Sequence, residues 1–326
     1  MVLWSQHYVD STRFGPGAGR DGLLSVAFGS ILLGFSAIFV KWGLSGGASP
    51  LVIGLYRMLF ALPGSVLLVW REGGGLGDCK GVIWALFAGV AFAGDLQFWH
   101  ESMRYTSTAN ATFIVCGLSP VWVAMFSSLF SRVRYRWLGR IGHLLGISGA
   151  PVLAGARGAR VGNGRGEVIA AVASFCYAAF SLALARSRKS NSARQSLLWM
   201  SIGSLLTFVS IEVWQNQPLL AFDTSTWLGL IGLGVVVQLL AWLMINRGIA
   251  HIPIALSALA LSLQQLATPL LAASILHEPL RLLGLLGGLL IVVGIYCVAT
   301  GIETRDKGAP PLSSPVQVAE KCDAIE

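Results

Sequence analysis

The sequence contains few charged residues: Asp, Glu, Lys and Arg make up 12% of its 326 residues, and hydrophobic residues make up 55%. A soluble domain carries about 25% charged residues. A chain of this length with a mean hydropathy of +0.70 is therefore typical of a protein that crosses a membrane several times, with the lipid bilayer as its surroundings.

The sequence also lacks the motifs of metal, disulfide and nucleic-acid proteins. Its five cysteines form no CxxC pair and have no His at ligand spacing, so we predict no disulfide framework, metal site or cofactor. The first 20 residues have no apolar core, so we expect no cleavable signal peptide. The net charge of +8 lies in short segments between apolar runs, which does not favour a nucleic-acid partner.

Apolar runs of roughly 17 to 23 residues recur along the chain, long enough to cross a hydrocarbon core of about 30 Å. Breaks rich in Gly, Pro and charge separate them. The sequence therefore predicts an all-α polytopic membrane protein with ten transmembrane helices. We place them near residues 23–42, 50–70, 82–103, 109–130, 138–156, 167–185, 196–214, 226–247, 253–276 and 281–302.

An even number of spans puts both termini on one side of the membrane. Most Lys and Arg fall on that side, although Arg157, Arg160 and Arg165 oppose the trend. The positive-inside rule thus predicts both termini in the cytoplasm. We expect a multi-pass protein of the plasma membrane, which would be the inner membrane of a bacterium. The sequence also allows a homodimer.

The chain contains an internal repeat. A shift of 145 residues without a gap places 136–154 on 281–299, with eight identities in nineteen positions, three of them glycines. Each half then has five spans, so the two halves form inverted repeats, an architecture common in secondary transporters. The predicted organisation is a cytoplasmic tail (1–22), a first repeat (23–156), a connecting loop (157–166), a second repeat (167–302) and a disordered cytoplasmic tail (303–326).

Polar residues inside the spans are the candidates for function, because such residues usually face protein or a water-filled cavity. In the third span, AGDLQFWHESMR places Asp95 and Trp99 on one helical face and Gln97, His100 and Glu101 on another. A span with two polar faces should lie inside the bundle. In the eighth span, a stripe at i, i+4 and i+8 contains Gln238, Trp242 and Asn246.

Each candidate also has a structural interpretation. Arg57 is expected to be a structural charge that pairs with a carboxylate or helix carbonyls, with contact to an anionic group as the alternative. Asp95 and His100 are candidates for proton coupling, although a neutral, hydrogen-bonded His100 is equally compatible with the pattern. The proposed cavity lining could also serve helix packing; it consists of Trp99, Asn110, Trp122, Gln238, Trp242 and Gln265.

Three stretches together resemble a known family. WHESMRYTSTANATFIVCGLSPVWVAMF, IGLYRMLFALP and the second-half stretch from GIAHIP to LLGLLGG are similar to elements of EamA-type proteins in the drug/metabolite transporter superfamily. The resemblance covers residues 23 to 302 and includes Arg57 and Glu278. It departs from the family pattern at Gln265, which replaces a Pro, and at Val133, where the other repeat has Glu278. It implies a ten-helix transporter of small organic solutes.

The sequence therefore predicts a secondary transporter, not an enzyme, that moves an amino acid, metabolite or drug-like compound by alternating access, with proton-coupled efflux. One alternative is an intramembrane enzyme that uses Asp95, His100 and Glu101, although these residues point in different directions on one helix. The other is a structural or sensory membrane protein that transports nothing.

Overall fold

The computed structural model describes most of the chain. The described residues are 16–71, 73–131, 134–135, 137–138, 141–142, 144–145, 164–216, 219, 222–249, 252, 254–278, 286, 289–290, 292–294, 296–297 and 302–303. The predicted spans at 138–156 and 281–302, the connecting loop and both tails lie largely outside these residues, and so do the side chains of Asn246 and His143.

The first half of the described chain forms four of the predicted spans. The first span is split at Phe35 into α1 (Pro16–Gly34) and α2 (Ser36–Ser45). The next three spans are α3 (Pro50–Trp70), α4 (Cys79–Ser102) and α5 (Thr108–Ser131). Local capping explains two of the starts: the side chains of Ser49 and Asp78 accept backbone N–H groups of the first turns of α3 and α4.

The second half repeats this order. It contains α7 (Arg165–Ser187), α8 (Ala193–Gln215), a composite span and α11 (Ile254–Ile275). The composite span consists of α9 (Thr224–Gly232), the π-helical segment η2 (Leu233–Ala241) and α10 (Trp242–Ile249). Six of the described helical stretches are long and apolar enough to cross a membrane: Arg20–Ser45, Pro50–Trp70, Cys79–Ser102, Arg165–Ser187, Ala193–Gln215 and Thr224–Ile245.

The described chain is helical apart from one short strand pair. β1 (Arg134–Tyr135) and β2 (Ile302–Glu303) pair in antiparallel fashion, with Arg134 opposite Glu303. The all-α prediction did not include this pair. β1 follows α5 and β2 follows the last predicted span, so the pair brings these two points of the chain together.

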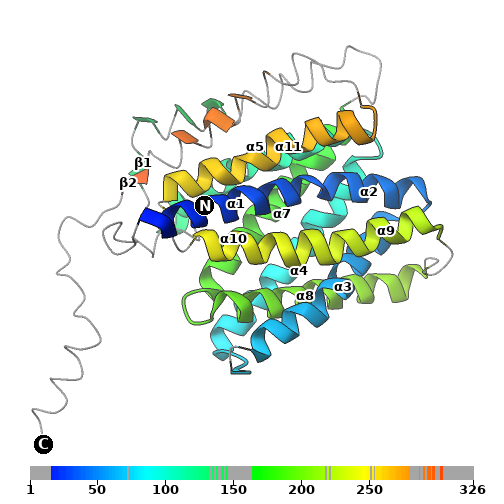
Figure 1. Ribbon diagram of the computed structural model, residues 1–326, viewed down its shortest axis with the longest axis horizontal. Helices are drawn as coiled ribbons and strands as arrows, with labels where there is room; N and C mark the ends of the chain where they lie inside the picture. The colour runs from blue at the N-terminus through cyan, green and yellow to red at the C-terminus, as the bar shows by residue number, and fades with distance from the viewer. Residues whose placement is uncertain are drawn as a thin grey trace, which may run out of the picture.

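Helices of the two halves pack against each other throughout the bundle. From the first half, α4 packs on α7 and α8, and α5 packs on α7. From the second half, the composite span packs on α1, α2 and α3, and α11 packs on α1 and α2. Figure 1 shows α1 and α2 between α11 and the run from α9 to α10. Each contact therefore has a counterpart between the equivalent helices of the other halves; for example, α4 on α8 corresponds to the composite span on α3. This is expected of two related halves.

Equivalent helices of the two halves run in opposite directions. The start of α5 at Thr108 contacts Glu278, which follows the end of α11. We call this side of the bundle the Glu278 end; α2, α4 and α8 also end there, and α3, α7 and α9 begin there. At the opposite side, the Cys79 end, the backbone N–H of Asp78 donates to Oδ1 of Asn191 at 2.7 Å. The repeats are thus inverted in space.

Candidate functional site

The site is organised around Arg57, a cation buried in α3 and only 4% exposed. Its Nε donates to Oε1 of Gln238 at 2.9 Å, and its Nη1 donates to Oγ of Ser36 at 3.2 Å. The guanidinium carbon lies 5.6 Å from the centre of the Phe92 ring. A buried charge is costly without such partners, so these contacts hold α2, α3, α4 and η2 together.

Both direct partners of Arg57 lie at irregular points of their spans. Ser36 is the first residue after the interruption at Phe35, and Gln238 lies within the π-helical segment. Such irregular turns frequently occur at functional sites, and discontinuous helices near the interface of two repeats are typical of transporter binding sites. The irregular backbone thus presents a hydroxyl and an amide to the same cation.

Asp95 lies on α4 and is 4% exposed. It interacts electrostatically with Arg57. The ion pairs shorter than 4.0 Å in the described part of the chain join other residues, so this interaction is not a direct salt bridge. One carboxylate oxygen of Asp95, Oδ1, has no hydrogen-bond partner among the described residues. A buried acid thus lies near a buried base without a salt bridge between them.

Three further helices contribute to the surroundings of Asp95. Cys116 of α5 and Tyr177 of α7 lie close enough to Asp95 for their charges to interact, and the Gln265 side chain of α11 lies beside Cys116. With the partners of Arg57, these residues form what we call the buried polar cluster: Ser36, Arg57, Asp95, Cys116, Tyr177, Gln238 and Gln265. Cys116 and Tyr177 are half-buried, and the other five are buried. Its members come from both repeats.

His100 and Trp99 lie closer to the Glu278 end. His100 is fully buried, and its Nδ1 lies 3.2 Å from the carbonyl oxygen of Pro50, so it links α4 to the start of α3. Trp99 is 7% exposed, and its ring centre lies 5.5 Å from that of His100. Glu101 instead pairs with Arg104 at 3.2 Å on a more exposed surface. Adjacent residues of the stretch AGDLQFWHESMR therefore have different surroundings.

The remaining predicted cavity residues are spread over the bundle. Trp122 donates its indole N–H to Oγ of Ser174 at 2.9 Å, at the interface of α5 and α7. Trp242 is half-buried at the start of α10, one turn beyond Gln238. Asn110 is buried in the first turn of α5 near the Glu278 end. The structure thus brings Gln238 and Gln265 into the cluster with Arg57 and Asp95, and it places Trp122 at the interface of α5 and α7 and Asn110 near the Glu278 end.

The sequence prediction missed several residues of this region. Cys116, Ser36 and Tyr177 are not among the site residues that the sequence predicts. No local pattern marks them, because each is a common residue in an apolar helix. Lys41, which lies at the Glu278 end, was a more visible candidate for a functional residue, since it is a lone cation in the apolar run SAIFVKWGL. In the described part of the chain, no group of three His, Cys, Asp or Glu side chains is arranged to hold a metal ion.

Comparison with known proteins fits this arrangement of two related halves. Residues 20–154 and residues 164–300 each match the EamA-like transporter family. The chain belongs to this family. The resemblance noted in the sequence is therefore confirmed, and this EamA-like protein is a multi-pass membrane protein of a transporter family within the drug/metabolite transporter superfamily.

A solved structure has a similar fold. It is described as "Crystal structure of protein", is 20% identical in sequence and superimposes with a TM-score of 0.62, over 86% of this chain and 96% of that chain. No curated protein sequence matches this chain.

Proposed function

We propose that this EamA-like protein is a secondary transporter that exports a small organic solute across the plasma membrane by alternating access, coupled to protons through Asp95. The observation that carries the proposal is the position of Asp95: a carboxylate that is 4% exposed, in helix α4, where it packs against the second repeat. Intramembrane carboxylates commonly mark substrate or proton pathways.

Asp95 is better suited to carry the proton than His100. Nε2 of His100 also has no partner among the described residues, but its Nδ1 is fixed at the Pro50 carbonyl. Asp95 instead lies near the buried cation Arg57, and its Oδ1 has no partner among the described residues. A proton or a donor group of the solute could occupy this oxygen in turn. Arg57 lies close enough to interact with Asp95 but is bonded directly to Gln238 and Ser36. Arg57 would thus stabilise the ionised carboxylate without blocking it.

We further propose that Trp99, Gln238, Trp242 and Gln265 line the solute pathway. Gln265 lies in α11, which is the counterpart of α5 in the other repeat. Gln238 lies in η2, within the span that is the counterpart of α4. The Cys79 end would face the cytoplasm and the Glu278 end the outside, in keeping with the distribution of Lys and Arg. Under this proposal Trp122 and Asn110 serve helix packing.

The geometry does not favour the enzyme alternative. Asp95 faces Arg57 and Cys116, His100 contacts the Pro50 carbonyl and Glu101 pairs with Arg104. Catalysis by a set of acid–base groups requires them to reach the same reacting atoms. These three residues instead have separate surroundings along α4.

The test begins with a comparison of metabolites inside and outside cells with and without the protein, which supplies the solute. Purified protein is then placed in liposomes, and solute flux is measured with and without a pH gradient. Asp95→Asn should abolish gradient-driven flux while exchange of labelled for unlabelled solute continues, which also shows that the variant is folded. Glu101→Gln, on the same helix, is the matched control and should retain both.

Two results would contradict the proposal. Undiminished gradient-driven flux in Asp95→Asn would remove Asp95 from coupling. Absence of any solute that accumulates or is exchanged in a protein-dependent way would favour a structural or sensory role instead.

A further inference from the structure

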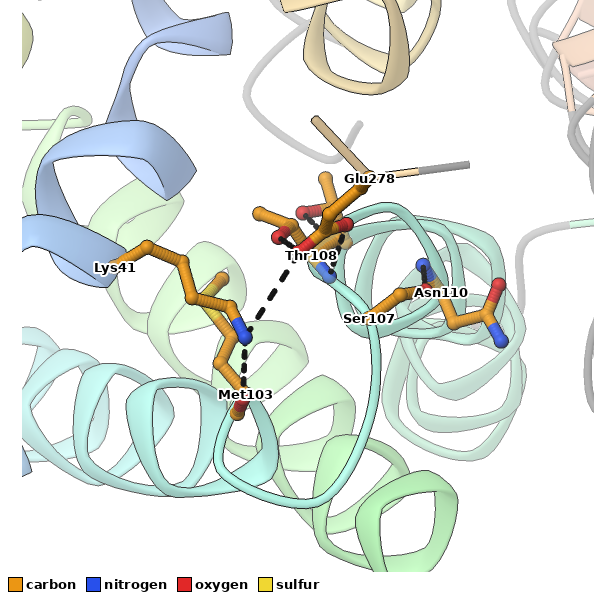
Figure 2. Close-up of polar contacts among 7 residues, drawn as sticks. Lys41, Met103, Ser107, Thr108, Asn110 and Glu278 are labelled. Carbon is orange, nitrogen blue, oxygen red and sulfur yellow. Dashed lines mark hydrogen bonds and ion pairs between the residues drawn. The ribbon is translucent and has the colours of Figure 1, made fainter. Parts of the chain in front are cut away.

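A polar cluster at the Glu278 end joins helices of both repeats (Figure 2). Glu278 accepts hydrogen bonds from the backbone N–H of Thr108 at 3.2 Å and from the Thr108 hydroxyl. Nζ of Lys41 lies 3.9 Å from Oε1 of Glu278 and donates to the carbonyl oxygen of Met103 at 2.8 Å. Four spans therefore meet here, through α2, the end of α4, the start of α5 and the residues after α11.

The backbone around Glu278 holds its carboxylate in place. His277 has a φ of +54°, a left-handed conformation that ends α11. The backbone N–H of Glu278 then donates to the carbonyl oxygen of Ala272 at 3.2 Å, so the chain folds back onto the last turn. This termination directs the Glu278 side chain toward the first turn of α5.

The sequence makes this cluster specific to one end of the bundle. In the 145-residue repeat, Glu278 corresponds to Val133 and Thr108 corresponds to Pro253. Valine cannot accept a hydrogen bond through its side chain, and proline has no backbone N–H to donate. Lys41 corresponds to Arg186, whose guanidinium carbon lies 4.7 Å from the centre of the Trp84 ring. The same bonds therefore cannot form at the equivalent place at the Cys79 end.

The cluster is also only partly shielded from water. The side chains of Lys41 and Glu278 are 27% and 20% exposed, whereas Arg57 is 4% exposed. Water can replace the bonds of a partly exposed ion pair when helices separate, but separation of a fully buried pair leaves its charges unsatisfied. The contacts at the Glu278 end are thus suited to repeated breaking and re-forming.

We propose that Lys41, Thr108 and Glu278 form a gate that closes the solute pathway at the Glu278 end. The contacts between them are present when this end is closed, and they separate when α5 and α11 move apart to open it. A two-state transporter needs such a set of differential contacts, present in one state and absent in the other. This inference rests on the proposed alternating-access function.

Cys116 provides a native reporter for the gate, because this half-buried thiol of α5 belongs to the same polar cluster as Asp95. The other cysteines are replaced by serine (Cys79, Cys176, Cys297 and Cys322). A membrane-impermeant maleimide is then applied to intact cells and to inside-out vesicles. With the gate intact, Cys116 should react slowly from the side of the Glu278 end.

Glu278→Gln removes the negative charge that contacts both Lys41 and Thr108. This variant should raise the rate of Cys116 labelling from the side of the Glu278 end at least about tenfold. Lys41→Met should act in the same direction, and Thr108→Val less strongly because its backbone N–H remains. Glu101→Gln is the matched control: it breaks the Glu101–Arg104 pair near the same end but within one segment of chain, and should leave the labelling rate unchanged.

Unchanged labelling in folded Glu278→Gln and Lys41→Met, judged by size-exclusion elution, would overturn the gate. If these variants fail to fold, a second experiment uses a protein in which Lys41→Cys and Glu278→Cys are the two cysteines. A bifunctional, reducible thiol reagent then bridges the two positions. The bridge should stop flux, and reduction should restore it; full flux through the bridged protein would overturn the gate. Faster labelling without flux of any solute in the wild type would instead sustain the gate and reject the transport proposal.

Discussion

Arg57 and Gln238 lie 181 residues apart in the sequence, in different repeats, and are joined by a hydrogen bond of 2.9 Å from Nε to Oε1. The bond links α3 to the π-helical segment of the eighth span. Because Arg57 is a buried cation, its neutral partners stabilise a charge that would otherwise be unsatisfied. The bond therefore couples the stability of the two repeats.

Gln238→Leu should lower the free energy of unfolding by about 1.5–3 kcal/mol, the usual contribution of a hydrogen bond to a charged group. The measurement is unfolding by titration with SDS in mixed micelles. Ser210→Ala is the control: this exposed hydroxyl donates to the carbonyl of Leu206 in its own helix, so its loss should change stability by less than about 0.5 kcal/mol. Equal stability of Gln238→Leu and wild type would show that the amide does not hold Arg57.

Gly89 allows α4 and α8 to approach closely. A Cβ at this position would lie 2.3 Å from the carbonyl oxygen of Met200 and 2.7 Å from the backbone N of Ser204, and backbone atoms cannot move aside as a side chain can. We expect Gly89→Ala to destabilise the protein by about 1–3 kcal/mol, measured in the same SDS titration.

Gly94 on the same helix is the matched control for Gly89. Its added Cβ would meet only the Cys176 side chain, with Sγ at 3.3 Å. Gly94→Ala should therefore be neutral or stabilising by up to about 1 kcal/mol through helix propensity. A loss of stability as large as that of Gly89→Ala would contradict the close-approach argument.

Asp223 caps α9 at the Glu278 end. Hydrogen bonds from Ser225 and Thr226 lower the pKa of its carboxyl below the usual value. A lowered pKa in the folded state means that the ionised carboxylate stabilises the fold above the unfolded pKa of about 3.9, and this contribution is lost as the pH falls through the folded pKa. Wild type should therefore lose more thermal stability than Asp223→Asn between pH 5 and pH 3, measured as the Tm in detergent.

The orientation of the bundle can be tested with a cysteine at each end. Cys79 is exposed at the Cys79 end, and Ser45 is exposed at the other end. In proteins with one cysteine each, an impermeant maleimide should label Cys79 only in inside-out vesicles and Ser45→Cys only in intact cells. The reverse pattern would place the Glu278 end in the cytoplasm and would invert the proposed direction of the gate.

The spans were predicted well where the apolar runs were uninterrupted. The run at 50–70 forms α3 from Pro50 to Trp70, because about 20 apolar residues in a helix match the thickness of a bilayer. The break at Phe35 and the π-helical segment at Leu233–Ala241 were not predicted. Both places also contain glycine and a polar residue (Gly34 and Ser36, Gly234 and Gln238), but such residues are common in regular membrane helices, so the sequence alone did not mark these irregular turns.

The candidate site was predicted in part. Asp95, Arg57, Gln238 and Gln265 stood out as polar residues in apolar runs, and the structure brings them into one cluster. Trp122 stood out in the same way, yet its indole bonds to Ser174 at a helix interface. Composition identifies a polar residue inside a span, but not the helix that it faces.

The sequence by itself determined that this is a multi-pass membrane protein with two related halves, because hydropathy, helix length and repeat spacing can be read along the chain. The family followed from the resemblance of particular stretches and from the match over both halves. Only the tertiary structure decided that Arg57 bonds to Gln238 and that Lys41 and Thr108 meet Glu278. These partners lie more than 160 residues apart, and their meeting depends on how inverted helices pack, which no local pattern encodes.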